Sequence, residues 1–266
     1  MKRIIALVLA ILMMGALFTG CGGSATDMTD LEYVMDKGTL KIGYTVYDPM
    51  NYTDEDGNFV GFDTEYAKLV CEKLGVEPEF IEINWDTKEV DLNAKDIDCI
   101  WNGFTITEER EEQLDFTTPY ILNKQVVVIR KADADKYTDT ASLADVTLTA
   151  EKASAGESAI ADDENLKNAA YVESDVQTSA LMSVKASTAD ACVVDYTVAY
   201  AMAGKGDYKD LMVIEGLDLA VEEYGIGFRT GSDIVVKVNE ATAELIADGT
   251  LEVLADKYGL KDNLIK

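Results

Sequence analysis

The stretch from residue 40 to residue 84 sets the fold, with LKIGY at 40–44, GFDTEYAKLVCEKLG at 61–75 and EFIEIN at 79–84. The first and last pieces are short and rich in β-forming residues, which is typical of strands. The middle piece repeats apolar residues at steps of three and four and ends at a glycine, which predicts a helix. Strand, helix and strand in this order are the unit of a parallel sheet, so we predict an α/β fold.

The alternation of strands and helices continues on both sides of DFTTPY at 115–120. Strands are expected at 98–101, 125–130, 146–150, 171–174, 190–194 and 221–228, and helices at 86–94, 233–248 and 251–258. A short helix capped by Thr107, with Glu108 and Glu109 in its first turn, is expected after the strand at 98–101. Two such series predict two α/β lobes joined by extended crossings near 120–124 and 220–225. We expect lobe 1 to comprise 37–121 and 222–266, lobe 2 to comprise 122–221, and a cleft between them that closes about the hinge.

The N-terminus has the pattern of an export signal. A charged start precedes a nearly unbroken apolar run at 4–18, which is shorter than the ~20 residues that span a bilayer. FTGC at 18–21 resembles a bacterial lipobox, in which the cysteine is acylated, although Phe18 replaces the usual leucine. We expect a signal peptide at 1–20, a lipid on Cys21 that anchors an extracytoplasmic protein to the cell membrane, and a linker over 21–36. An ordinary signal peptide with unmodified Cys21 is the alternative.

Composition excludes several classes of protein. Fifty acidic and 23 basic residues among 266 give a net charge of -27, which repels phosphate backbones, so we expect no nucleic-acid partner. The absence of histidine removes His-based triads, His-ligated zinc and imidazole bases. Cys71 and Cys99 are expected to be small buried hydrophobes, with a disulfide between them as the alternative. Together with Cys192 they make three cysteines besides Cys21, so at least one thiol should be free.

Polar and aromatic residues follow the ends of the predicted strands. In open parallel sheets, ligands bind beyond the carboxyl ends of the strands, where loops converge and helix N-termini present free N–H groups. These ends are 44–48, 84–86, 102–105, 153–156 and 195–196. Two lobes would place them on opposite sides of one cleft.

Six motifs in register resemble the bacterial extracellular solute-binding proteins, specifically the polar amino-acid-binding components of ABC importers. The motifs are GFDTEYA (61–67), WD (85–86), NGFTITEER (102–110), DFTTPY (115–120), VD (194–195) and YGIG (224–227), followed by ADGTL (247–251). The similarity covers about 38–259, nearly all of the mature chain. It implies a periplasmic-binding-protein-like type II fold.

The resemblance also implies a ligand site made by both lobes. Arg110 would hold the ligand α-carboxylate bidentately, with Thr105, the Gly103 backbone and Asn102 beside it. A surface arginine paired with a neighbouring glutamate is the alternative for Arg110, and plain turn chemistry is the alternative for Asn102 and Gly103. Asp195 would bind the ligand ammonium from lobe 2, a role that is compatible with capping the helix that follows it.

The remaining site residues rest on the same resemblance. Ser154 and the N–H groups of Ala155 and Gly156 would face the carboxylate from lobe 2, although Ala153 and Ala155 depart from the glycine and hydroxyl residue usual there. Tyr47 and Trp85 would sandwich the ligand; a core position for Trp85 and a surface position for Tyr47 are the alternative. The unusual KEVDL at 88–92 is expected to lie on a helix rather than in the pocket.

The function implied is capture without chemistry. A polar L-amino acid, with a neutral side chain favoured by Asn102 and Thr105, would be bound by a monomer and delivered to an ABC permease and its ATPase. We expect no enzyme activity, no cofactor and no metal. A sensory receptor module, or a dehydratase-like enzyme on the same scaffold with Glu222 and Glu223 as candidate acids, are the alternatives.

Overall fold

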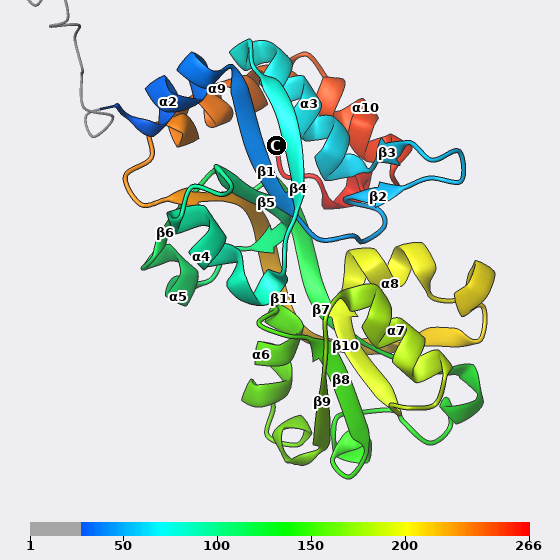
Figure 1. Ribbon diagram of the computed structural model, residues 1–266. Helices are drawn as coiled ribbons and strands as arrows, with labels where there is room; N and C mark the ends of the chain where they lie inside the picture. Colours follow the sequence, from blue (N-terminus) through cyan, green and yellow to red (C-terminus); the bar gives the residue numbers. More distant parts are fainter. Residues whose placement is uncertain (1–27) are drawn as a thin grey trace, which may run out of the picture.

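The computed structural model describes residues 28–266, which form two lobes (Figure 1). The predicted signal peptide at 1–20, the lipid on Cys21 and the start of the predicted linker lie outside the described residues. The strands are β1 (Thr39–Tyr44), β2 (Tyr52–Thr53), β3 (Phe59–Val60), β4 (Glu77–Glu82), β5 (Cys99–Thr105), β6 (Leu114–Phe116), β7 (Ile121–Arg130), β8 (Thr147–Glu151), β9 (Ala170–Ser174), β10 (Ala191–Asp195) and β11 (Leu211–Arg229). The α-helices are α2 (Asp30–Lys37), α3 (Phe62–Leu74), α4 (Lys88–Asn93), α5 (Glu108–Glu111), α6 (Ala155–Asp162), α7 (Gln177–Lys185), α8 (Tyr196–Met202), α9 (Ile234–Ala247) and α10 (Thr250–Lys257).

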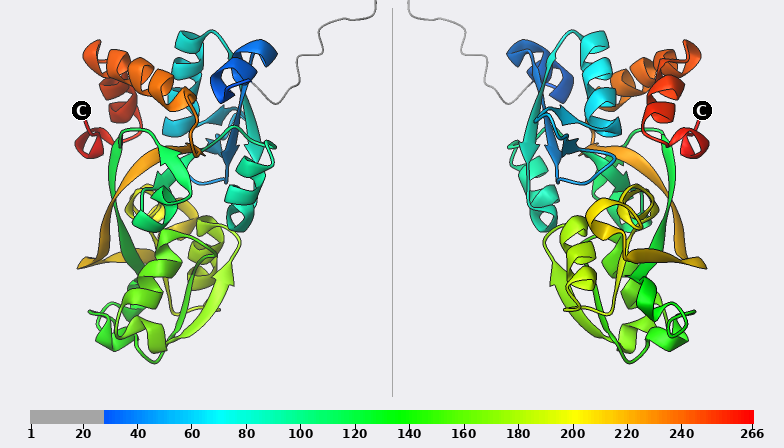
Figure 2. Two further views of the ribbon diagram at one scale, coloured as in Figure 1. Left: turned by 90° about the vertical axis from the view of Figure 1, so that its left-hand side faces the viewer. Right: turned by 90° about the vertical axis from the view of Figure 1, so that its right-hand side faces the viewer.

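One mixed sheet runs through both lobes in the order β4-β1-β5-β11-β7-β10-β8-β9, with β6 also paired to β11, and β2 and β3 form a separate two-stranded sheet. In one lobe β1 pairs in parallel with β4 and β5, and in the other β8 pairs in parallel with β10 and β9. The antiparallel pair β7 and β11 runs from lobe to lobe (Figure 2). This confirms the predicted α/β class with two extended crossings. β11 has 19 residues, far more than the run predicted at 221–228, because its first part from Leu211 already pairs with β7.

Helix α3 forms where the apolar repeat predicts it. Gly75 ends the helix in the left-handed conformation, at a φ of 74° that favours glycine. Its buried face includes Tyr66, Val70 and Cys71, and the C-terminal helices α9 and α10 pack against this helix. The Tyr66 hydroxyl lies 2.5 Å from the Thr242 hydroxyl on α9. The chain therefore returns to the first lobe after it has built the second.

Helix α2 begins inside the segment that we expected to be a linker, 21–36, and this is a difference from the prediction. Thr29 and Glu32 form a capping box at the start of α2, and Val34 is buried in the core. These contacts satisfy the first N–H groups of the helix and give it an apolar face, which is enough to order a short segment against a lobe.

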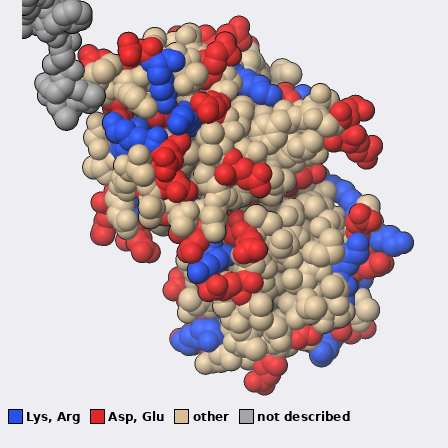
Figure 3. Space-filling model, viewed as in Figure 1, with Lys and Arg blue, Asp and Glu red and all other residues tan. Residues whose placement is uncertain are grey.

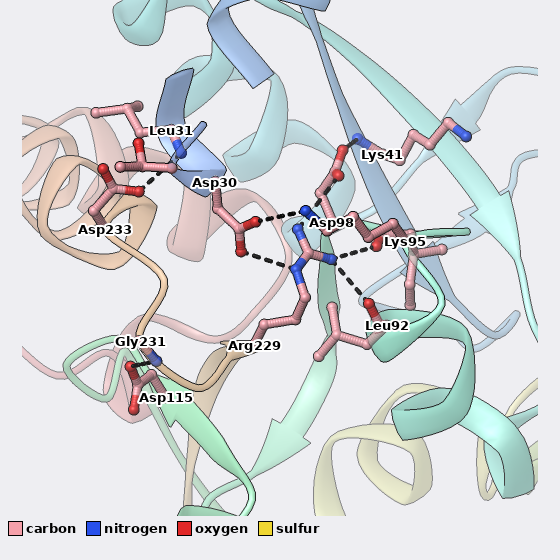
Figure 4. A network of polar contacts seen from close by, with 12 residues as sticks. Asp30, Leu31, Lys41, Leu92, Lys95, Asp98, Asp115, Arg229, Gly231 and Asp233 are labelled. Carbon is pink, nitrogen blue, oxygen red and sulfur yellow. Dashed lines mark hydrogen bonds and ion pairs between the residues drawn. The ribbon is translucent and has the colours of Figure 1, made fainter. Parts of the chain in front are cut away.

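A buried arginine ties α2 to the first lobe (Figure 4). Arg229 at the end of β11 donates Nε to Asp30 Oδ2 at 2.8 Å and Nη1 to the carbonyl oxygens of Leu92 and Ile97, both at 2.9 Å. Its Nη2 lies 3.6 Å from Oδ1 of buried Asp98. Because charges are almost never fully buried without partners, this network accounts for an arginine inside the lobe.

The cysteines and the surface agree with the expectations from composition. In the part of the chain that the structure describes, Cys71, Cys99 and Cys192 are buried free thiols, so the alternative Cys71–Cys99 bridge is not formed. Figure 3 shows acidic side chains over both lobes on the face in view, with basic side chains interspersed among them. Residues 28–266 contain no helix that is both long enough and apolar enough to cross a membrane.

Candidate functional site

A small cavity of about 10 Å³ lies between the two lobes, which is about the space of one water molecule. It is lined by Tyr47, Trp85, Asn102, Gly103, Thr105, Arg110, Glu151, Ser154, Ala155, Gln177 and Asp195. Every predicted ligand-binding residue except Gly156 is among these residues. Gly156 lies one position further into α6, where an added Cβ would be 2.9 Å from the Val193 carbonyl oxygen. Its role in this structure is therefore close packing against β10.

Asn102 on β5 holds the loop that carries Tyr47. Its Nδ2 donates to the Thr45 carbonyl at 2.8 Å and to Asn51 Oδ1 at 2.7 Å. Its Oδ1 accepts from the Thr45 backbone N–H at 3.0 Å and from the Thr45 hydroxyl at 2.8 Å. An amide side chain has two donors and two acceptor positions, so these four bonds occupy all of them. The Asn102 side chain is committed to positioning the loop.

Gly103 and Tyr47 lie against each other at the floor of the cavity. Gly103 has a φ of 56°, and an added Cβ would lie 1.6 Å from the Tyr47 hydroxyl, so only glycine fits. The Gly103 N–H donates to Asp63 Oδ2 at 2.7 Å. The Tyr47 hydroxyl is buried and has no hydrogen-bond partner among residues 28–266. Tyr47 therefore presents an unused polar atom to the site, which differs from the surface position given as its alternative.

Arg110 crosses the cleft from α5. Thr107 caps this short helix, as predicted, by accepting from the Arg110 N–H at 3.2 Å. The guanidinium donates Nη1 to the Thr105 carbonyl at 2.7 Å and Nη2 to the Ala153 carbonyl of the other lobe at 3.4 Å. It lies 4.6 Å from the centroid of the Phe104 ring. Arg110 is therefore oriented by its own lobe and aimed at the opposite one.

Trp85 belongs to both the core and the cavity wall. Its ring packs edge to face on Phe104 at 5.4 Å, inside a buried apolar cluster, and it also lines the cavity. The core alternative and the site prediction are thus compatible for Trp85. Trp101 on the neighbouring part of β5 is fully buried against Tyr66 and belongs to the core alone.

Asp195 lies at the carboxyl end of β10, on the other side of the cavity from Arg110. Its Oδ1 accepts from Asn123 Nδ2 at 2.8 Å and from Gln125 Nε2 at 2.5 Å, and its Oδ2 accepts from Gln177 Nε2. The position precedes α8, but among the described residues its side chain makes no capping hydrogen bond to that helix. Burial raises the pKa of Asp195. The carboxylate is fixed by three amides and directed toward the cavity.

Glu222 forms a carboxyl pair with Asp195 at the hinge. It lies on β11 opposite Asn123 of β7, and its Oε1 accepts from Asn123 Nδ2 at 2.6 Å, from Gln125 Nε2 at 2.9 Å and from the Thr105 hydroxyl at 3.0 Å. Burial, and then the nearby Asp195 carboxylate, raise the pKa of Glu222 to about 8. The same two amides hold both acids, so the hinge, the Asp195 side chain and Thr105 form one network.

Two charged residues of the site were missed by the sequence analysis. Glu151, the last residue of β8, lines the cavity with one oxygen unpartnered among the described residues, and burial raises its pKa to about 8. Its place directly after the strand predicted at 146–150 is the signal that could have identified it. Lys88 is buried at the cleft and reaches Ala153 of the other lobe, so the expectation that 88–92 lies away from the pocket is wrong at this residue. Helix α4 starts at Lys88, and its first turn faces lobe 2.

Ser154 and Ala155 start helix α6 at the second-lobe wall. Ser154 Oγ accepts from the Glu157 N–H at 3.2 Å and so caps the helix. Ala155 also lines the cavity. The N-terminus of an α-helix carries free N–H groups and a partial positive charge, so this wall suits an anionic group.

Glu222→Gln is expected to flatten the pH dependence of folding stability. The pKa of Glu222 is raised from 4.5 in the unfolded chain to about 8, so protonation stabilises the fold and this contribution is lost as the pH rises between these values. The wild-type free energy of unfolding should therefore fall from pH 5 to pH 8, and the variant should lose less. Urea unfolding at both pH values measures this difference, and equal losses in the two proteins would contradict the assignment.

The fold and the site define a two-lobed binding protein of the periplasmic type, with its ligand cleft at the hinge. The family model of the bacterial extracellular solute-binding proteins, family 3, matches residues 40–261, and the chain belongs to this family. The L-cystine-binding protein TcyJ of Escherichia coli K12 is 29% identical over 86% of this chain and 85% of its own length.

Solved structures of amino-acid-bound proteins have the same fold as this chain. The protein Tv2483 bound to L-arginine matches with a TM-score of 0.83 and 28% identity, over 89% of this chain and 96% of that one. An ABC uptake transporter substrate-binding protein of Streptococcus pneumoniae with bound histidine matches with a TM-score of 0.80 and 28% identity, over 90% and 99% of the two chains.

Proposed function

We propose that this protein captures a polar amino acid and delivers it to an ABC importer. The observation that carries the proposal is that Arg110 of one lobe and Asp195 of the other line a single cavity between them. A free amino acid is a zwitterion, and a fixed cation facing a fixed anion complements its two charges. A planar guanidinium is also the side chain best suited to hold a carboxylate through two hydrogen bonds.

Capture on this scaffold requires the lobes to separate. The cavity of about 10 Å³ has room for about one water molecule, whereas an amino acid has roughly ten heavy atoms. The movement falls on β7 and β11, where Glu222 pairs with Asn123 and Tyr224 with Ile121 between the lobes. Closure around the ligand would then exclude water and strengthen both charged contacts in a lower dielectric. The ligand must bind the closed state better than the open one for this closure to occur.

The transport role extends beyond the described residues. We propose that a signal peptide at 1–20 directs export, that a lipid on Cys21 anchors the extracytoplasmic protein, and that the closed monomer docks on a permease driven by an ATPase. The lobe limits proposed from the sequence, 37–121 with 222–266 and 122–221, place the hinge at the β7–β11 pair. We propose that no chemistry occurs on the ligand.

The ligand proposed here is an amino acid of the polar class. Relatives carry names that specify L-cystine, and solved structures of the family hold L-arginine or histidine. From the sequence, Asn102 and Thr105 favoured a ligand with a neutral side chain. The Asn102 amide makes all four of its hydrogen bonds within lobe 1, so it no longer supports that preference. The Thr105 hydroxyl donates to Glu222 Oε1 at 3.0 Å and can still accept a hydrogen bond, so the preference for a neutral ligand rests on this acceptor.

A thermal-shift screen of the twenty amino acids and cystine tests the proposal. At 1 mM, a ligand with a Kd near 1 μM should add about 4 kcal/mol to the free energy of unfolding. That should raise the Tm by roughly 10 °C for a chain of this size. At least one polar amino acid is expected to give such a shift. No shift from any of them would overturn the proposed function.

A second experiment, on the tightest ligand from the screen, separates binding from catalysis. After incubation of the protein with its tightest ligand, mass spectrometry should recover the ligand unchanged. Loss of water or carbon dioxide from that ligand, or turnover of a prephenate-like substrate, would instead support the dehydratase-like alternative.

A further inference from the structure

A second buried cation lies beside Arg110 in the cleft. Lys88, the first residue of α4, is 2% exposed, although lysine is among the residues least often buried. Its Nζ donates to the Trp85 carbonyl of its own lobe at 3.0 Å and lies 5.0 Å from the centroid of the Trp85 ring. It also reaches across the cleft to the Ala153 carbonyl at 3.3 Å. Lys88 is thus held by its own lobe and points toward the other.

Lys88 and Arg110 converge on the same acceptor. Arg110 Nη2 lies 3.4 Å from the Ala153 carbonyl oxygen that Lys88 also contacts, so one neutral oxygen serves two cations. A carboxylate accepts such hydrogen bonds more strongly than a carbonyl, because it carries a full charge and two oxygens. Both cations also line an open groove of about 920 Å³ that shares Thr105, Arg110 and Ala155 with the cavity, so a ligand entering the cleft meets them together.

The Ala153 carbonyl occupies this place only while the lobes are closed. Ala153 lies in lobe 2 and has a φ of 56°, which is unfavourable for a residue with a Cβ. Its N–H is held by Glu157 Oε2 at 2.7 Å. When the lobes separate, Lys88 and Arg110 both lose this acceptor, while their bonds to the Trp85 and Thr105 carbonyls stay within lobe 1. The open cleft would then present two adjacent, unfilled cationic donors.

The acids near Lys88 leave room for an anionic ligand group. Glu89 Oε1 pairs with Lys88 Nζ at 3.2 Å, but its side chain is 29% exposed and lies at the rim. Glu151 faces Lys88 and Arg110 from lobe 2 and is itself buried. Burial raises the pKa of Glu151 to about 8, so it adds little negative charge at neutral pH. Asp195 and Glu222 also act on Arg110, but both are held by the Asn123 and Gln125 amides at the hinge. The buried acid that faces both cations is thus Glu151.

We propose that Lys88 and Arg110 together form the receptor for the ligand carboxylate, which takes the place of the Ala153 carbonyl between them. The proposal rests on the amino-acid-binding function proposed above and adds a residue to its carboxylate site. Lys88 is then a ligand-binding residue, and its cation is not merely part of the packing of α4.

Lys88→Met tests this assignment because methionine keeps the unbranched apolar stem and removes the charge. The probes are the amino acid that binds tightest in the thermal-shift screen and its C-terminal amide, which lacks the carboxylate charge, both measured by isothermal titration calorimetry. Lys88→Met should raise the Kd of the acid about 30-fold and change the Kd of the amide by less than about threefold. Lys88→Arg, which keeps a cation, should restore most of the affinity for the acid.

Lys152→Met is the matched control for cleft closure. Lys152 also joins the lobes, since its Nζ lies 3.2 Å from Asp86 Oδ2, but its side chain is 44% exposed and, unlike Lys88, does not line the groove. This variant should bind acid and amide as the wild type does. Equal binding of the acid by Lys88→Met and wild type, or an equal loss for acid and amide, would overturn the role of Lys88. Absence of binding by the wild-type protein would instead overturn the proposed function itself.

Discussion

Arg110→Ala is expected to raise the Kd for the amino acid at least 1,000-fold, equivalent to about 4 kcal/mol. The variant removes the planar donor that faces the cavity and leaves the ligand carboxylate without its main partner. Arg110 contacts the Thr105 and Ala153 carbonyls at the cleft and lies over the buried Phe104 ring of its own lobe. Two of these three contacts are at the cleft, so its loss should affect binding more than folding. Isothermal titration calorimetry with the tightest ligand from the screen measures the change.

Arg110→Lys separates charge from geometry at this position. Lysine keeps a cation but cannot make two parallel hydrogen bonds to a carboxylate, so the Kd should rise by about 10- to 100-fold rather than 1,000-fold. The Tm without ligand should stay close to that of the wild type in both variants. Wild-type affinity in Arg110→Ala would show that the carboxylate lies elsewhere, whatever the result for Lys88.

The position of the site could be predicted because it follows from topology. Once the chain is recognised as two series of strands and helices, the carboxyl ends of β5 and β10 must approach one another at the hinge. Thr105, Arg110 and Asp195 lie directly at or after those ends, and the structure brings all three to one cavity. Local periodicity was sufficient to predict the strand ends at Thr105 and Asp195, whereas Arg110 was predicted from the family resemblance.

The detailed role of each side chain could not be predicted, because it depends on partners distant in sequence. The amide of Asn102 and its place near a strand end are typical of a ligand contact. Its four hydrogen bonds nevertheless go to Thr45 and Asn51, more than fifty residues away along the chain. Gly103 is similar, since its N–H is taken by Asp63. A sequence pattern identifies polar groups at a strand end, but only the folded chain shows which of them remain unpaired.

The burial of charged residues at the cleft was the other feature that could not be predicted from the sequence. Lys88 looks like an ordinary member of a solvated surface in a chain of net charge -27, and Glu222 was named only as a candidate acid of the dehydratase-like alternative. Lys88 is buried because the first turn of α4 faces lobe 2, and Glu222 is buried because β11 pairs with β7 through the hinge. Both placements arise from contacts between lobes, which no periodicity within one lobe encodes.

Asp195→Asn is expected to weaken binding about 100-fold or more, equivalent to roughly 3 kcal/mol, while the protein without ligand becomes no less stable at pH 8. Asparagine keeps the shape and one acceptor for Asn123 and Gln125, but it loses the acceptor of the Gln177 bond and the charge that meets the ligand ammonium. Calorimetry with the tightest amino acid measures the affinity. Glu173→Gln, which removes an exposed carboxylate of the same lobe, is the control and should leave binding unchanged.

The expected stability of Asp195→Asn follows from the sign of the pKa shift. Burial raises the pKa of Asp195 above the 3.8 of an unfolded chain, so its protonated form is favoured by folding and the ionised form is a cost that grows as the pH rises. Asparagine removes that cost, and it also removes repulsion from Glu222 when both acids are ionised. The Tm of the variant relative to wild type should therefore be higher at pH 8 than at pH 4. A side chain whose loss weakens binding but not folding is present for the ligand. If the variant is instead less stable than the wild type at pH 8 and still binds the amino acid, then Asp195 serves the fold and another residue holds the ammonium.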